Sequence, residues 1–344
     1  MIGTPIPNAS HVADFAAREP VELPRRQFLQ LTTGAFAFPA VSRTASARSY
    51  PERPVRVIIG FAPGGGVDIV ARLIGQWLSE RLRQPFIIEN RPGAGSTIAA
   101  EAVVGAPADG YTLFWATSAN AINATLYNNL SYNFVRDIAP VAGVIRLPNV
   151  MEVNLSVPVK TVSEFIAYAK TNPGKVNVAT VSGTTLYMAG ELFMMMTGVN
   201  MLQVPYRGAA TAVTDLLAGE MQVMFDILTG SMQYIKAGRL RLLAVTSAAR
   251  SEALPDIPTV GETVPGYEAS SWNGVGVPRN TPAETVAKLN AEIDAALADP
   301  NIKARLADLG GAPMPMKPAE FGALVVTETE KWAKVVKFSG AKPD

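Results

Sequence analysis

The chain of 344 residues contains no cysteine and a single histidine, His11. Without cysteine it cannot form disulfides, zinc–thiolate sites, iron–sulfur clusters or thiol nucleophiles. If residue 11 is removed with a targeting segment, the working protein has no imidazole, which excludes histidine acid–base catalysis and Ser-His-Asp triads. Excess charge is also lacking, because 30 Lys and Arg stand against 29 Asp and Glu. This balance argues against a nucleic-acid binder, which usually carries a basic surface.

What the sequence contains is typical of a packed globular protein. Apolar residues make up 48% and charged residues 17% of the chain. This composition differs from that of disordered proteins. A chain of this length is expected to form roughly two domains.

The first 47 residues are predicted to be an export signal. Arg25-Arg26 forms a twin-arginine pattern, and the uncharged, fairly apolar stretch 27–42 that follows is too short to span a bilayer. Ala45-Ser46-Ala47 is a small-x-small cleavage site. We therefore expect export to the periplasm by the twin-arginine route. The long polar leader before Arg25 is consistent with a start codon assigned too far upstream, and no cysteine is present for a lipoprotein anchor.

Cleavage after residue 47 changes the charge balance only slightly. It removes four of the 30 basic residues and three of the 29 acidic ones, leaving 26 of each and zero net charge. An exported, neutral chain with neither cysteine nor histidine favours binding over catalysis.

Apolar runs alternate with small-residue turns and helical spacing in the first part of the mature chain. The run 54–61 predicts a strand buried on both faces, and the glycine turn 62–66 leads into a helix over 69–82. A second strand (86–89), a glycine loop (92–96) opening a helix to residue 104, and a third strand (111–116) follow. This alternation predicts a doubly wound α/β domain.

A second set of elements begins near Met151. It comprises a helix to residue 170 with a capping box at 161–164, a strand over 176–180, the polar turn 182–185, a helix over 186–197, a helix ending at 217, and strands over 222–226 and 240–246. The segment 255–265 has three prolines and no periodicity, so we expect it to cross between domains. The rest is predicted to be helical, ending with a helix over 321–338.

The glycine loops are candidate anion sites. A helix N-terminus offers unpaired N–H groups and partial positive charge, and small residues let a ligand approach them. Open α/β sheets also bind ligands at their strand ends. The alternative, that these glycines only form tight turns, stays open.

Nucleotide-binding motifs do not fit these loops. A dinucleotide fingerprint starting at Gly64 would need glycine at position 69, which is Ile69, and the second loop has Ile98 where the third glycine belongs. A phosphate loop starting at Gly60 would need a Gly-Lys pair at 65–66, but position 66 is glycine. We therefore predict no cofactor and no metal.

Each of three charged residues near the strand ends has two possible roles. Asp68 lies in the first turn of a predicted helix, where it either senses a ligand or caps the helix. Asp226 ends a strand, where it either contacts a ligand amine or hydroxyl or makes a loop salt bridge. Arg207 either attracts an acid or is a solvated surface residue. By contrast, Met194-Met195-Met196, Trp272 and Trp332 are interpreted as packing residues.

Six stretches taken together resemble a known family. They read VRVIIGFAPGGGVDIVAR, IIENRPGAGSTIAA, DGYTLFWATS, VPYRGAATAVTDLLAGEMQVMFD, LLAVTSAARSEALPDIPTVGE and KWAKVVK. In this order they are similar to the Bug-type solute-binding proteins of tripartite tricarboxylate transporters. The resemblance runs from about Pro51 to Lys337, nearly the whole mature chain.

The resemblance implies a periplasmic binding protein with two α/β domains and a hinge. It implies a small carboxylated ligand, bound largely by backbone groups and partly through water, and passed to membrane transporter subunits. The ligand is expected between the loops Phe61–Asp68 and Val181–Thr185. We expect residues 48–151 and 266–344 to form domain 1, residues 152–265 to form domain 2, and the protein to act as a monomer that is neither an enzyme nor embedded in the membrane.

Twelve residues are predicted to contact the ligand. They are Phe61, Ala62, Gly64, Gly65, Gly66, Asp68, Ser118, Ser182, Gly183, Thr184, Thr185 and Asp226.

The second loop departs from the family pattern. The family usually has Gly-Ser-Gly-Ser with a histidine soon after, whereas this chain has Thr184 in a serine position and Tyr187 in the histidine position. Binding of a carboxylate by backbone N–H groups tolerates both changes, but the far end of the pocket and the identity of the ligand stay open.

Two other functions compete with this one. A ligand-presenting sensory protein for a two-component system would share the same fold. An exported hydrolase using Asp or Tyr is disfavoured, because the mature chain has neither His nor Cys and no Gly-x-Ser-x-Gly nucleophile elbow.

Overall fold

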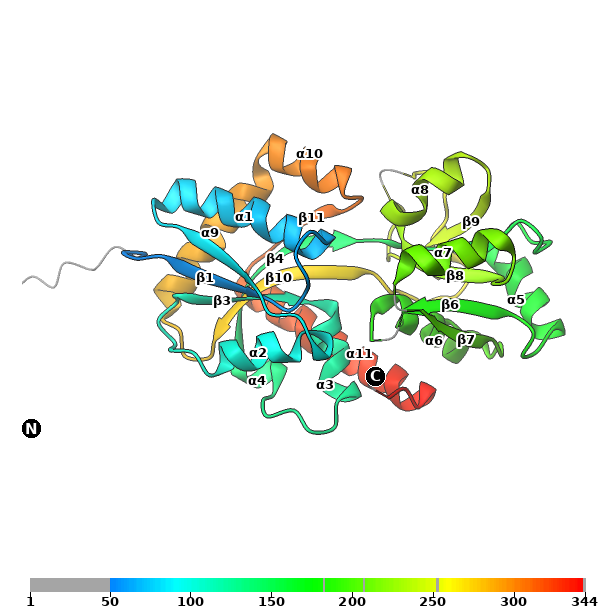
Figure 1. Ribbon diagram of the computed structural model, residues 1–344, viewed down its shortest axis with the longest axis horizontal. Helices are drawn as coiled ribbons and strands as arrows, with labels where there is room; N and C mark the ends of the chain where they lie inside the picture. The colour runs from blue at the N-terminus through cyan, green and yellow to red at the C-terminus, as the bar shows by residue number, and fades with distance from the viewer. Residues whose placement is uncertain (1–49, 182, 207, 252–253, 343–344) are drawn as a thin grey trace, which may run out of the picture. The chain divides into compact units, whose positions relative to one another are not determined.

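A computed structural model describes residues 50–181, 183–206, 208–251 and 254–342 (Figure 1). The predicted export signal lies outside these residues, as do Ser182 and Arg207. The described chain forms two sheets with helices packed against them, which confirms the α/β class. Among the described helices, none combines the length and apolarity needed to cross a membrane.

The first sheet has six strands in the order β11-β4-β10-β3-β1-β2. β1 pairs in parallel with β2 and β3, whereas β10 is antiparallel to both β3 and β4, and β11 is antiparallel to β4. The bounds are β1 Val55–Ile59, β2 Phe86–Asn90, β3 Thr112–Thr117, β4 Ile138–Leu147, β10 Ser271–Pro278 and β11 Ala312–Met316.

The second sheet has five strands in the order β7-β6-β8-β5-β9. β6 is parallel to β7 and β8, and β5 is antiparallel to β8 and β9. The bounds are β5 Asn149–Asn154, β6 Asn177–Val181, β7 Leu202–Tyr206, β8 Val223–Ile227 and β9 Leu240–Val245.

Helices cover both faces of each sheet. Their bounds are α1 Gly66–Leu82, η1 Ala94–Ser96, α2 Thr97–Val104, α3 Ser118–Leu126, α4 Phe134–Asp137, α5 Val162–Thr171, α6 Thr185–Thr197, α7 Ala209–Ala218, α8 Leu228–Lys236, η2 Val260–Glu262, α9 Ala283–Ala298, α10 Pro300–Asp308 and α11 Pro318–Ser339.

The strand pattern explains this coverage. In β1, Val57 and Ile59 pack in one core with α1, α9 and α10, while Ile58 packs in the other with α2, α3 and α11. These two groups of helices lie above and below the first sheet in Figure 1. Both faces of the strand are apolar because both are buried.

The chain passes between the sheets twice. Leu147 ends β4 and Asn149 begins β5, so only Pro148 separates the two strands. The return runs from β9 to β10 and includes the predicted crossing segment 255–265. The domain boundaries proposed from the sequence stay a prediction.

Two predicted features were incomplete. The C-terminal region is not wholly helical, because the strand β11 separates α10 from α11. Five strands were not predicted: β4, β5, β7, β10 and β11. The packing roles of Trp272 and Trp332 are confirmed, since both are fully buried.

Candidate functional site

The loop between β1 and α1 presents exposed backbone. Gly65 is the N-cap of α1 and receives no side-chain capping bond. A Cβ added at Gly64 or Gly66 would meet nothing within 4 Å, and one at Gly65 would meet only the Ala62 carbonyl oxygen, at 3.8 Å. Because the first N–H groups of a helix lack intrahelical acceptors, this loop can donate hydrogen bonds to an anion.

The buried carboxylate of Asp68 stabilises this loop through hydrogen bonds. It is 2% exposed, and its Oδ2 accepts from the Gly64 N–H at 2.9 Å and from Arg72 Nε at 2.8 Å. Its Oδ1 accepts from Asn90 Nδ2 at 2.8 Å, and the same amide donates to the Phe61 carbonyl at 3.0 Å. Hydrogen bonds from Arg72, and then from Gly64 and Asn90, lower the Asp68 pKa to about 2 despite burial. These contacts favour the capping role of Asp68.

The carboxyl ends of β1, β2 and β3 meet at one edge of the first sheet. Ile59 of β1 lies opposite Asn90 of β2 and Trp115 of β3. The glycine loop of residues 93–96 follows β2, and Ser118 begins α3 immediately after β3. Ser118 is 4% exposed. The loop 61–66 and Ser118 therefore belong to the same edge of the sheet.

The second predicted loop joins β6 to α6. Gly183 has φ +69°, and a Cβ there would meet nothing within 4 Å. The Thr184 hydroxyl donates to the Val181 carbonyl at 2.6 Å and accepts from the Leu186 N–H at 3.2 Å, so it caps α6. The capping role leaves the backbone at Gly183 as the open part of this loop. The predicted contact of Ser182 lies outside the described residues.

The second loop lies next to the first sheet. The Thr185 hydroxyl, at the start of α6, hydrogen-bonds to the Ser271 hydroxyl at the start of β10. Two residues further along β10, Asn273 pairs with Thr117, the last residue of β3. Thus α6 begins just beyond the edge at which β1 and β3 end.

Asp226 belongs to a buried acidic pair. It is 1% exposed, and Oδ1 accepts from the Ile227 N–H at 2.7 Å. The Ser231 hydroxyl lies 2.9 Å from its Oδ2 and 2.6 Å from Oε1 of Glu152, a fully buried residue of β5. Burial raises the pKa of both carboxyls. Because Asp226 is buried, the predicted ligand contact would require its carboxyl to become accessible.

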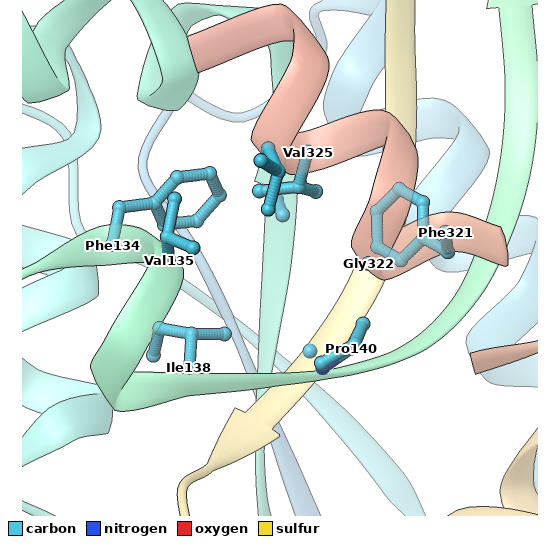
Figure 2. Close-up of a pocket in the computed structure, with 10 residues that line it drawn as sticks. Phe134, Val135, Ile138, Pro140, Phe321, Gly322 and Val325 are labelled. Atoms are coloured by element: carbon cyan, nitrogen blue, oxygen red, sulfur yellow. The ribbon is translucent and has the colours of Figure 1, made fainter. Parts of the chain in front are cut away.

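A separate pocket in the first sheet's unit is apolar. This cavity of about 180 Å³ lies where α4 and the first turns of α11 meet β4 and β10 (Figure 2). Its lining residues are Ala116, Phe134, Val135, Ile138, Pro140, Gly276, Phe321, Gly322, Val325 and Val326. It offers no charged or amide side chain to a carboxylate, so it is not the candidate anion site.

Sequence reasoning missed two contributors. Asn90 closes the β2 strand and links Asp68 to the Phe61 carbonyl, a role that depends on strand pairing. Glu152 was detectable as a lone acid within the apolar run Val150-Met151-Glu152-Val153. In the described part of the chain, no group of three or more His, Cys, Asp or Glu residues is placed to hold a metal ion.

This chain matches known proteins over most of its length. The family model described as "Tripartite tricarboxylate transporter family receptor" matches residues 70–340. BugT of Bordetella pertussis is 33% identical over 306 residues, covering 88% of this chain and 94% of BugT.

Two solved structures from Rhodopseudomonas palustris carry carboxylates. Rpa4515 with adipate is 38% identical with a TM-score of 0.73, covering 86% of this chain and all of that one. MatC with bound malate is 33% identical with a TM-score of 0.70, covering 83% of this chain and all of that one.

Proposed function

The chain belongs to the tripartite tricarboxylate transporter receptor family, the Bug-type solute-binding proteins, and we propose that it captures a small carboxylic acid in the periplasm. It then delivers this acid, unchanged, to the membrane subunits of such a transporter. One observation supports this most strongly: two strand–turn–helix units have glycine backbone open to a ligand, and α6 of one begins beside the sheet edge that carries the other.

The N–H groups of the two loops would bind the ligand carboxylate. Gly64, Gly65 and Gly66 leave the N-terminus of α1 open, and Gly183 does the same before α6. Asp68 does not oppose the bound anion strongly, because Arg72 pairs with its carboxylate at 2.8 Å. Phe61, Ala62, Ser118, Ser182, Thr184, Thr185 and Asp226 complete the proposed ligand-contacting set, partly through water.

A thermal-shift screen over small carboxylic acids tests the proposal. A ligand that binds only the folded state stabilises it by about 2.7 kcal/mol when present at 100 times its Kd. At least one acid is expected to raise the Tm in proportion to the logarithm of its concentration, whereas its methyl ester is not. Equal stabilisation by acid and ester would contradict carboxylate binding.

We propose that the first 47 residues direct the protein to the periplasm. We expect the double variant Arg25→Lys, Arg26→Lys to remain in the cytoplasm with its leader uncleaved, because the twin-arginine pattern marks the export route. Fractionation and immunoblotting report both location and size. Processed double variant in the periplasm at the wild-type level would contradict the twin-arginine assignment.

Closure of two domains on the ligand is the proposed mode of binding. Residues 48–151 with 266–344 would move against residues 152–265 about the two chain crossings. The Arg146 guanidinium at one crossing lies 3.2 Å from the Glu268 carboxylate at the other, and Lys331 of α11 lies 2.7 Å from the same carboxylate. Small-angle scattering should show a smaller radius of gyration with saturating ligand, and an unchanged profile would argue against closure.

A further inference from the structure

A chain of buried hydrogen bonds joins the second carboxylate loop, residues 181–185, to the first sheet. Thr185, the first residue of α6, is 5% exposed, and its hydroxyl hydrogen-bonds to the hydroxyl of Ser271. Ser271 begins β10 and pairs with Leu147, the last residue of β4. The Ser271 hydroxyl therefore lies where the first sheet ends and the chain leaves it for the second.

The same chain of hydrogen bonds reaches both crossings between the sheets. The Ser271 hydroxyl donates to Oδ1 of Asn149 at 3.4 Å, and Asn149 Nδ2 donates to the Ala269 carbonyl at 2.8 Å. Thr246, just after β9, donates its N–H to the Asn149 carbonyl at 2.8 Å, and its own carbonyl accepts from the Ala269 N–H at 2.9 Å. Asn149 belongs to the first crossing, and Thr246 and Ala269 belong to the return. These bonds therefore fasten the two crossings to each other.

The donors and acceptors of this chain fit together in one order. With the Ser271 hydrogen directed to Asn149 Oδ1, the Thr185 hydroxyl donates to the Ser271 oxygen. Asn149 and Thr246 are fully buried, and Ser271 is 9% exposed. Breaking one bond would leave a buried group unpaired, which costs more than the bond itself contributes. The first turn of α6 is therefore held in one place against the start of β10.

We propose that Ser271 is a positioning residue for ligand binding, which acts through Thr185 to hold the second carboxylate loop in place beside the two crossings. This inference rests on the carboxylate-receptor function proposed above. Thr185 carries the first N–H of α6 and follows Gly183, whose backbone is open to a ligand. A carboxylate that contacts both loops needs their N–H groups at the right separation. Fixing one loop before binding lowers the free energy that ordering it would otherwise cost.

The bond between Thr185 and Ser271 also lies at the pivot of the proposed domain closure. Ser271 belongs to the first sheet. Thr185 belongs to α6, which packs on the second sheet through the rings of Phe193 and Phe225. The bond therefore joins the two parts that would move against each other. A contact beside the crossings moves least when the domains rotate about them, so it can persist in the open and closed forms.

Calorimetric titration of Thr185→Val, Ser271→Ala and the double variant tests the proposal. The probes are butyrate, succinate, citrate and benzoate, together with any acid that raises the Tm in the thermal-shift screen. Each single variant is expected to bind every acid that wild type binds about tenfold more weakly. The factor should be similar for all of them, because the loop holds the carboxylate that they share. The double variant should be within about twofold of either single variant, since both substitutions break one bond.

Thr185→Ser and Thr281→Val are the matched controls. Thr185→Ser keeps the hydroxyl and should bind within about twofold of wild type. Thr281 is 8% exposed, and its hydroxyl donates to the Pro278 carbonyl at 2.7 Å, beyond the opposite end of β10. Thr281→Val also loses a buried threonine hydroxyl and should lower the Tm, but its affinity should equal that of wild type.

The outcomes separate this inference from the function on which it rests. Unchanged affinity of folded Ser271→Ala would overturn the positioning role alone, and so would losses of the single variants that add in the double variant. Failure of folded wild type to bind any of these acids would overturn the receptor function and the positioning role together. Thermal melts establish that each variant is folded. Ser271→Cys, with a similar size and only a weak S–H donor, replaces Ser271→Ala if the latter does not fold.

Discussion

Replacing Glu152 by glutamine is expected to abolish most of the loss of stability that the protein undergoes between pH 5.5 and 8. Glu152 lies within β5 and is fully buried. Burial, together with the charge of Asp226 and against a hydrogen bond from Ser231, raises its pKa from 4.5 to about 8. Between pH 4.5 and about 8, Glu152 therefore holds a proton in the folded state that it has released in the unfolded state.

The sign of the effect follows from this difference in bound protons. When the folded state binds more protons than the unfolded state, the free energy of unfolding falls as the pH rises. The slope is about 1.4 kcal/mol per pH unit for one group, and the loss is complete only above the folded-state pKa of about 8. The raised pKa of Asp226 acts in the same direction.

The geometry independently favours a proton in this pair. The Ser231 hydroxyl contacts a carboxyl oxygen of Glu152 at 2.6 Å and one of Asp226 at 2.9 Å, yet it has one hydrogen to donate. A proton on one of the two acids would supply the second hydrogen bond, donated to the Ser231 oxygen. Glutamine reproduces the size and the donor of a protonated glutamate without the titration.

Urea denaturation monitored by tryptophan fluorescence, at fixed pH values from 5.5 to 8, measures the effect. Wild type should lose several kcal/mol across this range, whereas Glu152→Gln should change little and be the more stable protein at pH 8. Glu330→Gln, an exposed change on α11, is the matched control and should follow wild type. A wild-type stability that does not change with pH would contradict the assignment.

This pair shows where sequence reasoning ends. With its only histidine in the predicted leader, the mature chain has no side chain whose unperturbed pKa lies between about pH 5.5 and 8. Glu152 and Asp226 come together because β5 and β8 pair with Val150 opposite Asp226, which places Glu152 two residues away on the same face. That register is set by the pairing of two strands that are distant in the sequence. Composition and periodicity therefore do not reveal it.

The strand–turn–helix units were predictable because their signals are local. The run 54–61 contains β1, and the predicted helix 186–197 differs from α6 by one residue at its start. Both have clear apolar periodicity and a small-residue turn beside them. The two open loops, which form the core of the candidate site, followed from these signals.

The missed strands contain residues that normally disfavour strands. β10 includes Gly274, where a Cβ would lie 2.2 Å from the Phe321 ring and 2.7 Å from the Ala142 carbonyl, so close packing of α11 and β4 requires the glycine. β11 includes Pro313 and Pro315, which an edge strand tolerates because its outer N–H groups need no partner. In both strands, tertiary packing overrides local propensity.

Substituting valine for Gly65 is expected to weaken ligand binding far more than it lowers stability. Gly65 has φ −78° and ψ 166°, an extended conformation that valine adopts readily. Its Cβ would make only an ordinary contact, 3.8 Å from the Ala62 carbonyl oxygen. Loss of the N-cap glycine costs about 1 kcal/mol or less. Gly64 is the poorer choice, because its φ of +84° would strain valine.

The loss of affinity follows from the position of the new side chain. An isopropyl group at Gly65 would stand over the first N–H groups of α1, where the carboxylate is proposed to bind. Each hydrogen bond to a charged group contributes about 1.5–3 kcal/mol, so losing one weakens the Kd by roughly tenfold to a hundredfold.

Calorimetry with an acid identified by the thermal-shift screen, together with thermal melts, separates binding from stability. Gly105→Val is the matched control, since Gly105 has φ −79° and lies at the far end of α2, away from both loops. It should leave affinity unchanged. An affinity of Gly65→Val equal to that of wild type would mean that this glycine serves the turn alone, and that the carboxylate is bound elsewhere.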